Sequence, residues 1–209
     1  MRFSLLAILL IGAWASGPGR AGATVASGQA EERVAQALAA IVPVSVSRDW
    51  AAARAAFPGA RWQERTSDTT PTVVREGITY PGTLDTNGYT DSLEGSLDLD
   101  GAPLRIEILG TPERVTMIRL NAPEGMLVGR AALRRALAAR GVAWRLLRCN
   151  PIGDANVPII VELTAGGRST IFEDTFSGEA SAYAFSFDGG MYDPADPPGD
   201  CPDELSDLR

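Results

Sequence analysis

The 209-residue sequence contains no lysine and no histidine, so all 19 of its basic residues are arginine. Without histidine there is no Ser-His or Cys-His nucleophile pair and no imidazole ligand for zinc or copper. Without lysine there is no Schiff base, no Ser-Lys dyad and no phosphate-loop lysine. Carboxylates, hydroxyls and arginine remain, and the composition therefore favours a binding protein over an enzyme. The exclusive use of arginine is also typical of a GC-rich bacterial gene.

Cysteine is scarce as well, because the chain has only Cys149 and Cys201. An even number of cysteines in an exported protein usually forms disulfides. We predict a Cys149–Cys201 bond, which closes a loop of about 53 residues and contributes on the order of 4 kcal/mol. Two free thiols are the alternative. A redox role is disfavoured because there is no C-x-x-C motif.

Long apolar runs are absent except at the start, where Phe3–Ala15 follows the basic Met1-Arg2. This run is shorter than the roughly 20 residues that span a bilayer. Small residues at Ala21-Gly22-Ala23, or secondarily at Ala13-Trp14-Ala15, suit signal peptidase. We therefore predict a signal peptide over 1–23, no membrane span after cleavage and a periplasmic or secreted protein. A retained membrane anchor is the alternative, and lipid attachment is excluded because no cysteine lies near the cleavage region.

The mature chain is acidic. Removing Arg2 and Arg20 leaves 17 basic and 26 acidic residues, a net charge of −9. Such a protein does not bind nucleic acid non-specifically. Its length suits one domain or two small ones.

Hydrophobic periodicity predicts an α+β fold, an antiparallel sheet with helices on one face. Helices are expected over 31–42, where Pro43 ends the first, over 49–57 and within 123–140. An Asp100-Gly101 hairpin is expected between two strands. The predicted strands cover 60–65, 72–80, 89–99, 104–108, 114–120, 143–149, 159–164, 169–176 and 181–187.

Two segments look like copies of one unit. Ala60–Arg65 resembles Ala143–Arg148, since each follows an alanine-rich helix and has an early tryptophan, Trp62 or Trp144. Two tandem α-β-meander repeats are one interpretation, and two unrelated halves of one domain are the other. The predicted organisation is a signal peptide (1–23), a disordered start and N-terminal helix (24–42), a first repeat (43–122), a second repeat (123–190) and an acidic tail tied by the disulfide (191–209).

This element order, with Trp62 and Trp144, resembles the secreted β-lactamase-inhibitor protein family. It is similar also to small two-helix outer-membrane assembly lipoproteins. The resemblance covers roughly residues 43–189 and includes no signature motif, so no binding residue carries over. It implies a concave sheet face that holds another protein. The single cysteine pair departs from a pattern of one disulfide per repeat.

A calcium-loop spacing occurs at Ser96, Asp98, Asp100 and Gly101, with Glu107 at the twelfth position. The oxygen-bearing side chains, those of Ser96, Asp98, Asp100 and Glu107, match the spacing of an EF-hand loop, and Gly101 matches its turn glycine. The surrounding residues alternate as in strands, however, and an EF-hand needs helices. A plain Asp-Gly hairpin is the alternative interpretation, and calcium is the one cofactor that the sequence leaves open.

Eight arginines and one acid lie within Arg114–Arg148. Guanidinium groups bind carboxylates and phosphates in pairs. The candidate binding residues for an anion or an acidic partner are therefore Arg130, Arg134, Arg135 and Arg145. Two other interpretations are open, namely that arginine coats the wet face of a helix or that it contacts the acidic tail.

Paired carboxylates are the remaining route to catalysis. Glu173 and Asp174 are adjacent in a strand and point to opposite faces, whereas Asp98 and Asp100 share a face on an exposed hairpin, a poor place to raise a pKa. We expect no catalytic residue and an exported, non-enzymatic periplasmic protein that contacts another protein or an anionic envelope component. The alternatives are a small carboxylate- or calcium-dependent hydrolase and a structural component of the envelope.

Overall fold

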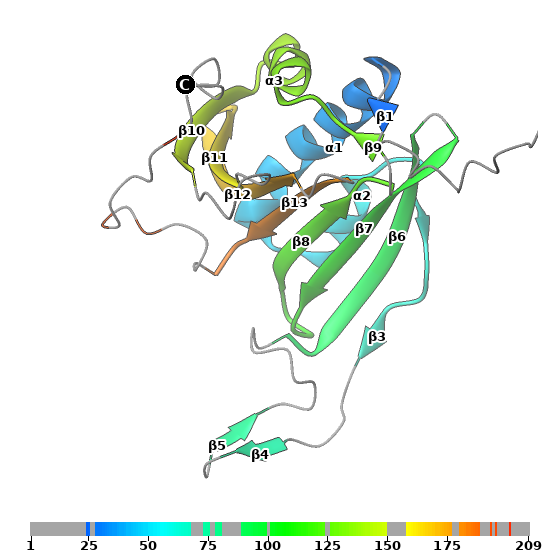
Figure 1. Ribbon diagram of the computed structural model, residues 1–209. Helices are drawn as coiled ribbons and strands as arrows, with labels where there is room; N and C mark the ends of the chain where they lie inside the picture. The colour runs from blue at the N-terminus through cyan, green and yellow to red at the C-terminus, as the bar shows by residue number, and fades with distance from the viewer. Residues whose placement is uncertain are drawn as a thin grey trace, which may run out of the picture.

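The protein has an α+β fold in which an antiparallel sheet packs against helices (Figure 1). The computed structural model describes residues 24–25, 28–67, 73–75, 78–80, 89–99, 101–123, 126–149, 158–176, 180–188, 193, 195 and 201. The predicted signal peptide, most of the acidic tail and Asp100 lie outside these residues. The predicted fold class is confirmed.

The described residues form three helices and one large sheet. The helices are α1 (Gly28–Ser47), α2 (Trp50–Ala55) and α3 (Arg130–Ala139). The sheet has the order β10-β11-β12-β13-β8-β7-β6-β2, with β3 also paired to β6. Its strands are β2 (Arg61–Trp62), β3 (Thr66–Ser67), β6 (Asp91–Leu99), β7 (Ala102–Gly110), β8 (Val115–Asn121), β10 (Ala143–Cys149), β11 (Ile159–Ala165), β12 (Arg168–Phe176) and β13 (Ser181–Ser186).

Two short pairs of strands stand apart from this sheet. β1 (Thr24–Val25) runs parallel to β9 (Met126–Leu127), and β4 (Val73–Arg75) pairs with β5 (Ile78–Tyr80). The strand expected over 72–80 is therefore a small hairpin that pairs with no strand of the large sheet within the described residues.

The first helix is longer than expected, because Pro43 lies inside it and does not end it. A proline inside a helix removes one hydrogen bond and costs about 3 kcal/mol or more. Pro43 is exposed, however, while Val42 and Val44 on either side of it are buried in the core. Burial of these neighbours keeps the last turn packed and offsets the cost. The short helix α2 then begins at its N-cap, Asp49, whose carboxylate accepts a hydrogen bond from the Ala52 N–H.

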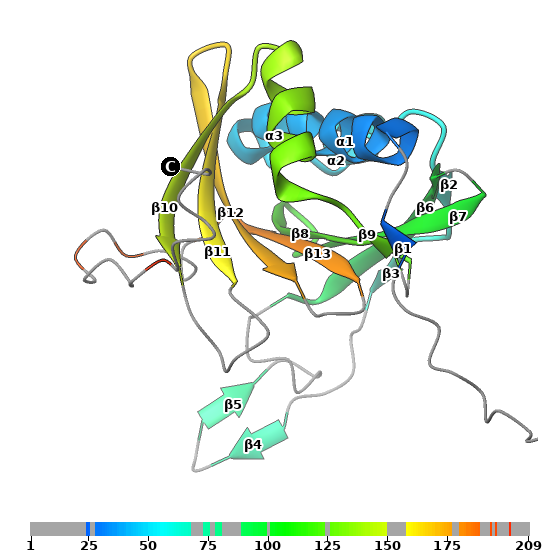
Figure 2. The same ribbon diagram turned by 45° about the horizontal axis from the view of Figure 1, so that its top comes forward.

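The core lies between α1 and the inner face of the sheet, which curves around α1 and α3 (Figure 2). Helix α1 packs against α3 and against β6, β11 and β12. Alternate residues of β6 and β7 point inward and are buried, among them Leu97 and Ile106. Phe172 is the centre of an aromatic group that contains Trp144, Tyr183 and Phe185. The concave face that the resemblance assigned to a partner is therefore filled by the protein's own helices.

The predicted disulfide is confirmed, since Cys149 and Cys201 are bonded. Cys149 ends β10 at the edge of the sheet and is buried. None of the described helices combines the length and apolarity that a membrane crossing requires. The sheet is continuous through the β8–β13 pair, where the two predicted repeats meet, and the repeat itself stays a prediction.

Candidate functional site

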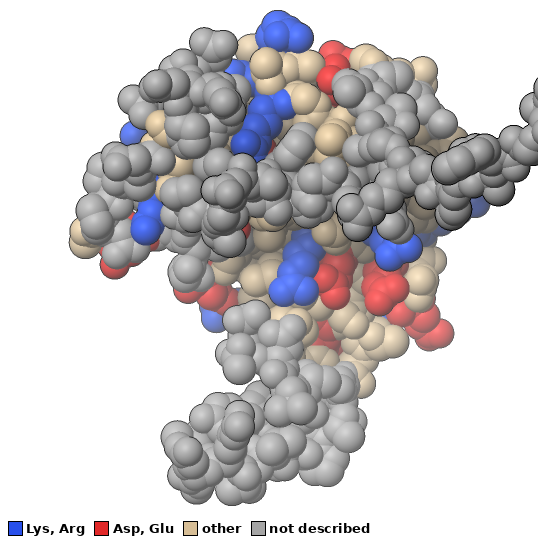
Figure 3. Space-filling view, in the orientation of Figure 1, with Lys and Arg blue, Asp and Glu red and all other residues tan. Residues whose placement is uncertain are grey.

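The outer face of the sheet, opposite the helices, is the exposed face over β2, β6, β7 and β8. Figure 3 shows acidic and basic side chains side by side over this part of the sheet. The alternation that buries Leu97 and Ile106 points their strand neighbours Ser96 and Arg105 outward. The same alternation therefore builds the core on one face and a charged surface on the other.

Register places the outward side chains in two rows that cross the strands. The first, which we name the acidic row, contains Gln63, Glu94, Glu107 and Arg119. The second, which we name the basic row, contains Arg61, Ser96, Arg105 and Asn121. The two rows are two residues apart along β6, a separation of roughly 6.6–6.8 Å. A line of negative charge thus lies beside a line of positive charge.

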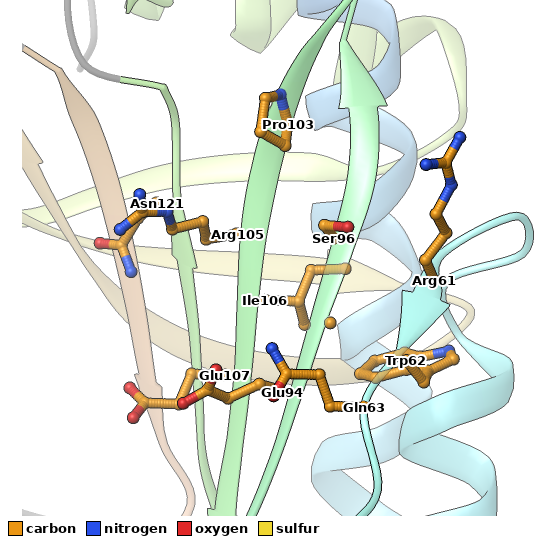
Figure 4. A pocket seen from close by; sticks show the side chains of 11 residues that line it. Arg61, Trp62, Gln63, Glu94, Ser96, Pro103, Arg105, Ile106, Glu107 and Asn121 are labelled. Carbon is orange, nitrogen blue, oxygen red and sulfur yellow. The ribbon is translucent and has the colours of Figure 1, made fainter.

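Both rows face a groove of about 610 Å³ (Figure 4). Seven of the eight row members line it, together with Trp62, Gly95, Pro103 and Ile106. Figure 4 shows Glu94, Glu107 and Gln63 near one another, with Arg61 on the side of β2 and Asn121 on the side of β8. The groove offers carboxylates, guanidinium groups, amides and a hydroxyl to a polar ligand.

The acidic row brings two like charges together. Glu94 is the direct cross-strand partner of Glu107, an arrangement that destabilises a sheet. Arg119 offsets part of this repulsion, because its Nη1 donates to Glu107 Oε2 at 3.2 Å. Glu94 is exposed, and its carboxylate has no ion pair within the described part of the chain. Glu94 is therefore the acid of this row that is open to a cationic partner.

Trp62 anchors the edge strand that supplies Arg61 and Gln63. Its indole lies edge-on to the buried Phe57, with the ring centroids 6.0 Å apart, and it crosses Gly95 of β6. A Cβ on Gly95 would be 2.5 Å from Trp62 Cε3, so a glycine is needed at this position. The two-residue β2 is too short to be held by its hydrogen bonds alone, and the indole fixes its place beside β6.

A partly buried salt bridge holds the chain just beyond β2. The Arg65 guanidinium lies 4.1 Å over the Trp50 ring and donates to Asp91 at 2.7 Å. Ser67 and Thr90 also donate to the Asp91 carboxylate. Burial alone would raise the pKa of Asp91, but these hydrogen bonds and the Arg65 charge lower it below the usual 3.8. The network fixes one end of β6 and hence the position of the rows.

Three residues of the predicted calcium loop, Ser96, Asp98 and Glu107, lie on the paired strands β6 and β7. Ser96 belongs to the basic row and Glu107 to the acidic row, on two different strands. Asp98 Oδ2 accepts from the Gly101 N–H at 3.4 Å, as in the hairpin interpretation, and Asp100 lies outside the described residues. Among the residues that the structure describes, no three His, Cys, Asp or Glu side chains are grouped so as to hold a metal ion.

The candidate arginines have different surroundings. Arg130 donates through Nε to the buried Asp174 at 2.8 Å, and Arg145 pairs with Glu162 on β11 at 2.6 Å. Arg135 is exposed on α3, and Arg134 is partly buried. Asp188, which precedes the tail, pairs with Arg48 and Arg114 and not with these four.

The Arg130–Asp174 pair lies in a buried polar cluster at the start of α3. Tyr183 is the cross-strand partner of Asp174, and Ser181 Oγ accepts from the Val128 N–H at 2.9 Å. Burial raises the pKa of Asp174; the Arg130 charge opposes this and the Glu173 charge adds to it. Burial, and then the Asp174 charge, raise the pKa of Tyr183 well above 10. The cluster attaches α3 to β12 and β13.

Sequence reasoning missed most of the groove, namely Arg61, Gln63, Glu94, Arg105 and Asn121. The alternation over 91–99 and 104–108 did carry a signal, since it places Glu94 and Ser96 on the face of Arg105 and Glu107. The pairing of Glu94 with Glu107 depends on register, which the hydrophobic pattern and the turn between these strands determine together.

Comparison of this chain with protein-family models, with curated proteins and with solved structures finds no match in any of the three.

Proposed function

We propose that this protein is an exported, non-enzymatic binding protein of the bacterial periplasm that holds a polar partner in the groove of its outer sheet face. The groove carries the proposal, because it places two charged rows on the sheet face that no described helix covers. Interfaces that read charge patterns gain specificity and association rate from such an arrangement. The partner is another protein or an anionic component of the envelope.

Export is supported by two features of the chain. The start combines the basic Arg2 with an apolar run and small-residue cleavage sites, as signal peptides do. The Cys149–Cys201 bond suits an oxidising compartment.

A tandem architecture is part of the same proposal. In the described residues α2 precedes β2, β6, β7 and β8, and α3 precedes β10 to β13. Under this interpretation each unit supplies one part of the sheet, and the groove belongs to the first unit alone.

Affinity recovery from periplasmic extract tests the proposal with two matched charge reversals. Arg105→Glu changes the groove, whereas Arg135→Glu changes the exposed arginine of α3. We expect Arg105→Glu to lose the partners that the mature protein retains, and Arg135→Glu to keep them. Loss with Arg135→Glu alone would move the binding site to α3, and retention by both variants would contradict the proposal.

A carboxylate hydrolase is the second candidate, and one observation favours it. Cross-strand partners such as Glu94 and Glu107 have Cβ atoms roughly 4.5–5.5 Å apart, and glycoside hydrolysis uses two carboxyls about 5–9 Å apart. Hydrolysis of envelope glycans by the mature protein, abolished in Glu94→Gln and in Glu107→Gln, would establish this candidate. Absence of turnover at any pH between 4 and 8 (roughly the range in which carboxylates act as acid or base) would discard it.

A further inference from the structure

We infer that the groove binds an extended polypeptide segment that carries one basic and one acidic residue two positions apart. This inference rests on the proposed function, because it names the chemistry of the partner in the same groove. The basic residue contacts Glu94 and Glu107 of the acidic row, and the acidic residue contacts Arg61 and Arg105 of the basic row.

Spacing is the first argument. The two rows are separated by two residues of β6, from Glu94 to Ser96, which is roughly 6.6–6.8 Å in a strand. An extended partner laid along β6 repeats its side chains on one face with the same period of two residues. Residues i and i+2 of the partner therefore reach the two rows together, whereas adjacent residues point to opposite faces.

Charge is the second argument. Arg119 compensates one of the two acids of the acidic row, so that row retains a net negative charge near Glu94. The basic row has two arginines, Arg61 and Arg105, and no acid. A partner with a single kind of charge would be attracted by one row and repelled by the other. A segment with both signs at the matching spacing is attracted by both.

The uncharged members of the rows indicate an extended chain and not a helix. Ser96, Gln63 and Asn121 bring a hydroxyl and two amides to the groove. A helix satisfies most of its own backbone N–H and C=O groups, while an extended segment leaves them free for such side chains. The groove therefore offers hydrogen bonds that the backbone of an extended segment can use and the backbone of a helix cannot.

The lysine-free chain allows a direct test with synthetic peptides and the mature protein. A carbodiimide joins a peptide lysine to a carboxylate, and this chain has no lysine of its own to compete. The probes are blocked peptides of Ser and Gly around Lys-Thr-Glu or Glu-Thr-Lys. The controls are the same peptides with Lys and Glu adjacent and with Lys and Glu four residues apart.

We expect one spaced peptide, Lys-Thr-Glu or Glu-Thr-Lys, to bind about 1.4-fold to fivefold more tightly than the adjacent pair, because the adjacent pair lacks one exposed ion pair. Cross-links should map to Glu94 or Glu107. Glu94→Gln and Arg105→Gln should each reduce binding, whereas Glu113→Gln, an exposed acid outside the groove, should not.

Three outcomes would overturn the inference: equal binding of spaced and adjacent peptides, tighter binding of the peptide with helical spacing, or binding of an uncharged oligosaccharide when no peptide binds. Each differs from failure of the proposed function, which appears as partner recovery that is indifferent to Arg105→Glu. If Arg105→Glu abolishes partner recovery while no spaced peptide binds, the groove is the binding site but its partner is not an extended segment of this kind.

Discussion

Reduction of the Cys149–Cys201 disulfide should destabilise the protein without dismantling the sheet. The bond joins residues that are 52 apart in sequence. For a loop of this size, the chain-entropy relation gives about 4 kcal/mol at 25 °C, through the freedom that the bond removes from the unfolded chain. The loop contains β11, β12 and β13, whose ladders do not involve the sulfur atoms. The folded state should therefore persist after reduction, with a lower free energy of unfolding.

Urea unfolding followed by tryptophan fluorescence, with and without a phosphine reductant, measures this loss. With a slope of about 2 kcal/mol per molar urea, a loss of about 4 kcal/mol lowers the midpoint by about 2 M. In thermal unfolding the same loss corresponds to about 8–16 °C for a chain of this size. The slope itself should rise on reduction, because the cross-linked unfolded chain is more compact and exposes less surface.

The double variant Cys149→Ala/Cys201→Ala is the matched control. Its urea midpoint should equal that of the reduced protein, after correction for the loss of a buried sulfur at position 149. The midpoint of the double variant should not change when the reductant is added. A reductant effect below about 1 kcal/mol would refute the entropic argument, because the formula allows no such small value for this loop. Two titratable thiols in protein recovered from an oxidising compartment would refute the bond itself.

Three further predictions concern the core and the buried acids. Phe172 is fully buried and contacts three other rings. Phe172→Ala should lower the free energy of unfolding by about 3–5 kcal/mol in chemical unfolding, and Phe172→Leu should lower it much less. Equal costs would show that the core collapses around the missing ring. The pKa of Asp91 is lowered, so its contribution to the free energy of unfolding is present above pH 3.8 and is lost as the pH falls. The pKa of Asp174 is raised, so its contribution to the free energy of unfolding is present below pH 3.8 and is lost as the pH rises. The free energy of unfolding is measured from pH 3 to 8, roughly the range over which linked carboxylates titrate. Asp91→Asn should destabilise the protein most at neutral pH, and Asp174→Asn should destabilise it least there. Parallel pH profiles for the two variants would contradict this. Gly95→Ala should push the Trp62 indole aside, lower the free energy of unfolding by about 1–3 kcal/mol and weaken binding in the groove. Gly28→Ala, whose added Cβ meets no atom within 4 Å, should leave binding unchanged. Unaltered near-ultraviolet circular dichroism in Gly95→Ala would contradict the packing argument.

Local patterns predicted much of the fold. The strand expected over 143–149 is β10, and a turn at Gly101, with φ +88°, precedes β7. These predictions held because strand alternation and turn chemistry depend on neighbours in sequence. Pro43 failed as a helix end because its cost is offset by the burial of Val42 and Val44, which contact residues remote in the chain.

The groove could be predicted only in part, for a related reason. Alternation assigns Glu94 and Glu107 to the same face, but it does not say that they are opposite one another. Which pairs meet depends on the register of β6 against β7 and of β2 against β6, and a shift of one residue would exchange the two faces. Arg130 shows the same limit, since its pairing with Asp174, a carboxylate buried on β12, depends on contact between distant segments.

The amino-acid sequence alone determined the absence of lysine and histidine side chains, the α+β class, the alternation of its strands and the partners in its disulfide. These follow from composition and from periods of two and 3.6 residues, which are local properties of the chain. Only the tertiary structure decided that α1 fills the concave face, that Asp174 is buried beside Arg130, and that an acidic and a basic row lie side by side over a groove. Those outcomes depend on strand register and on burial between distant segments, where the hydrophobic free energy of the whole core outweighs the preference of any one residue.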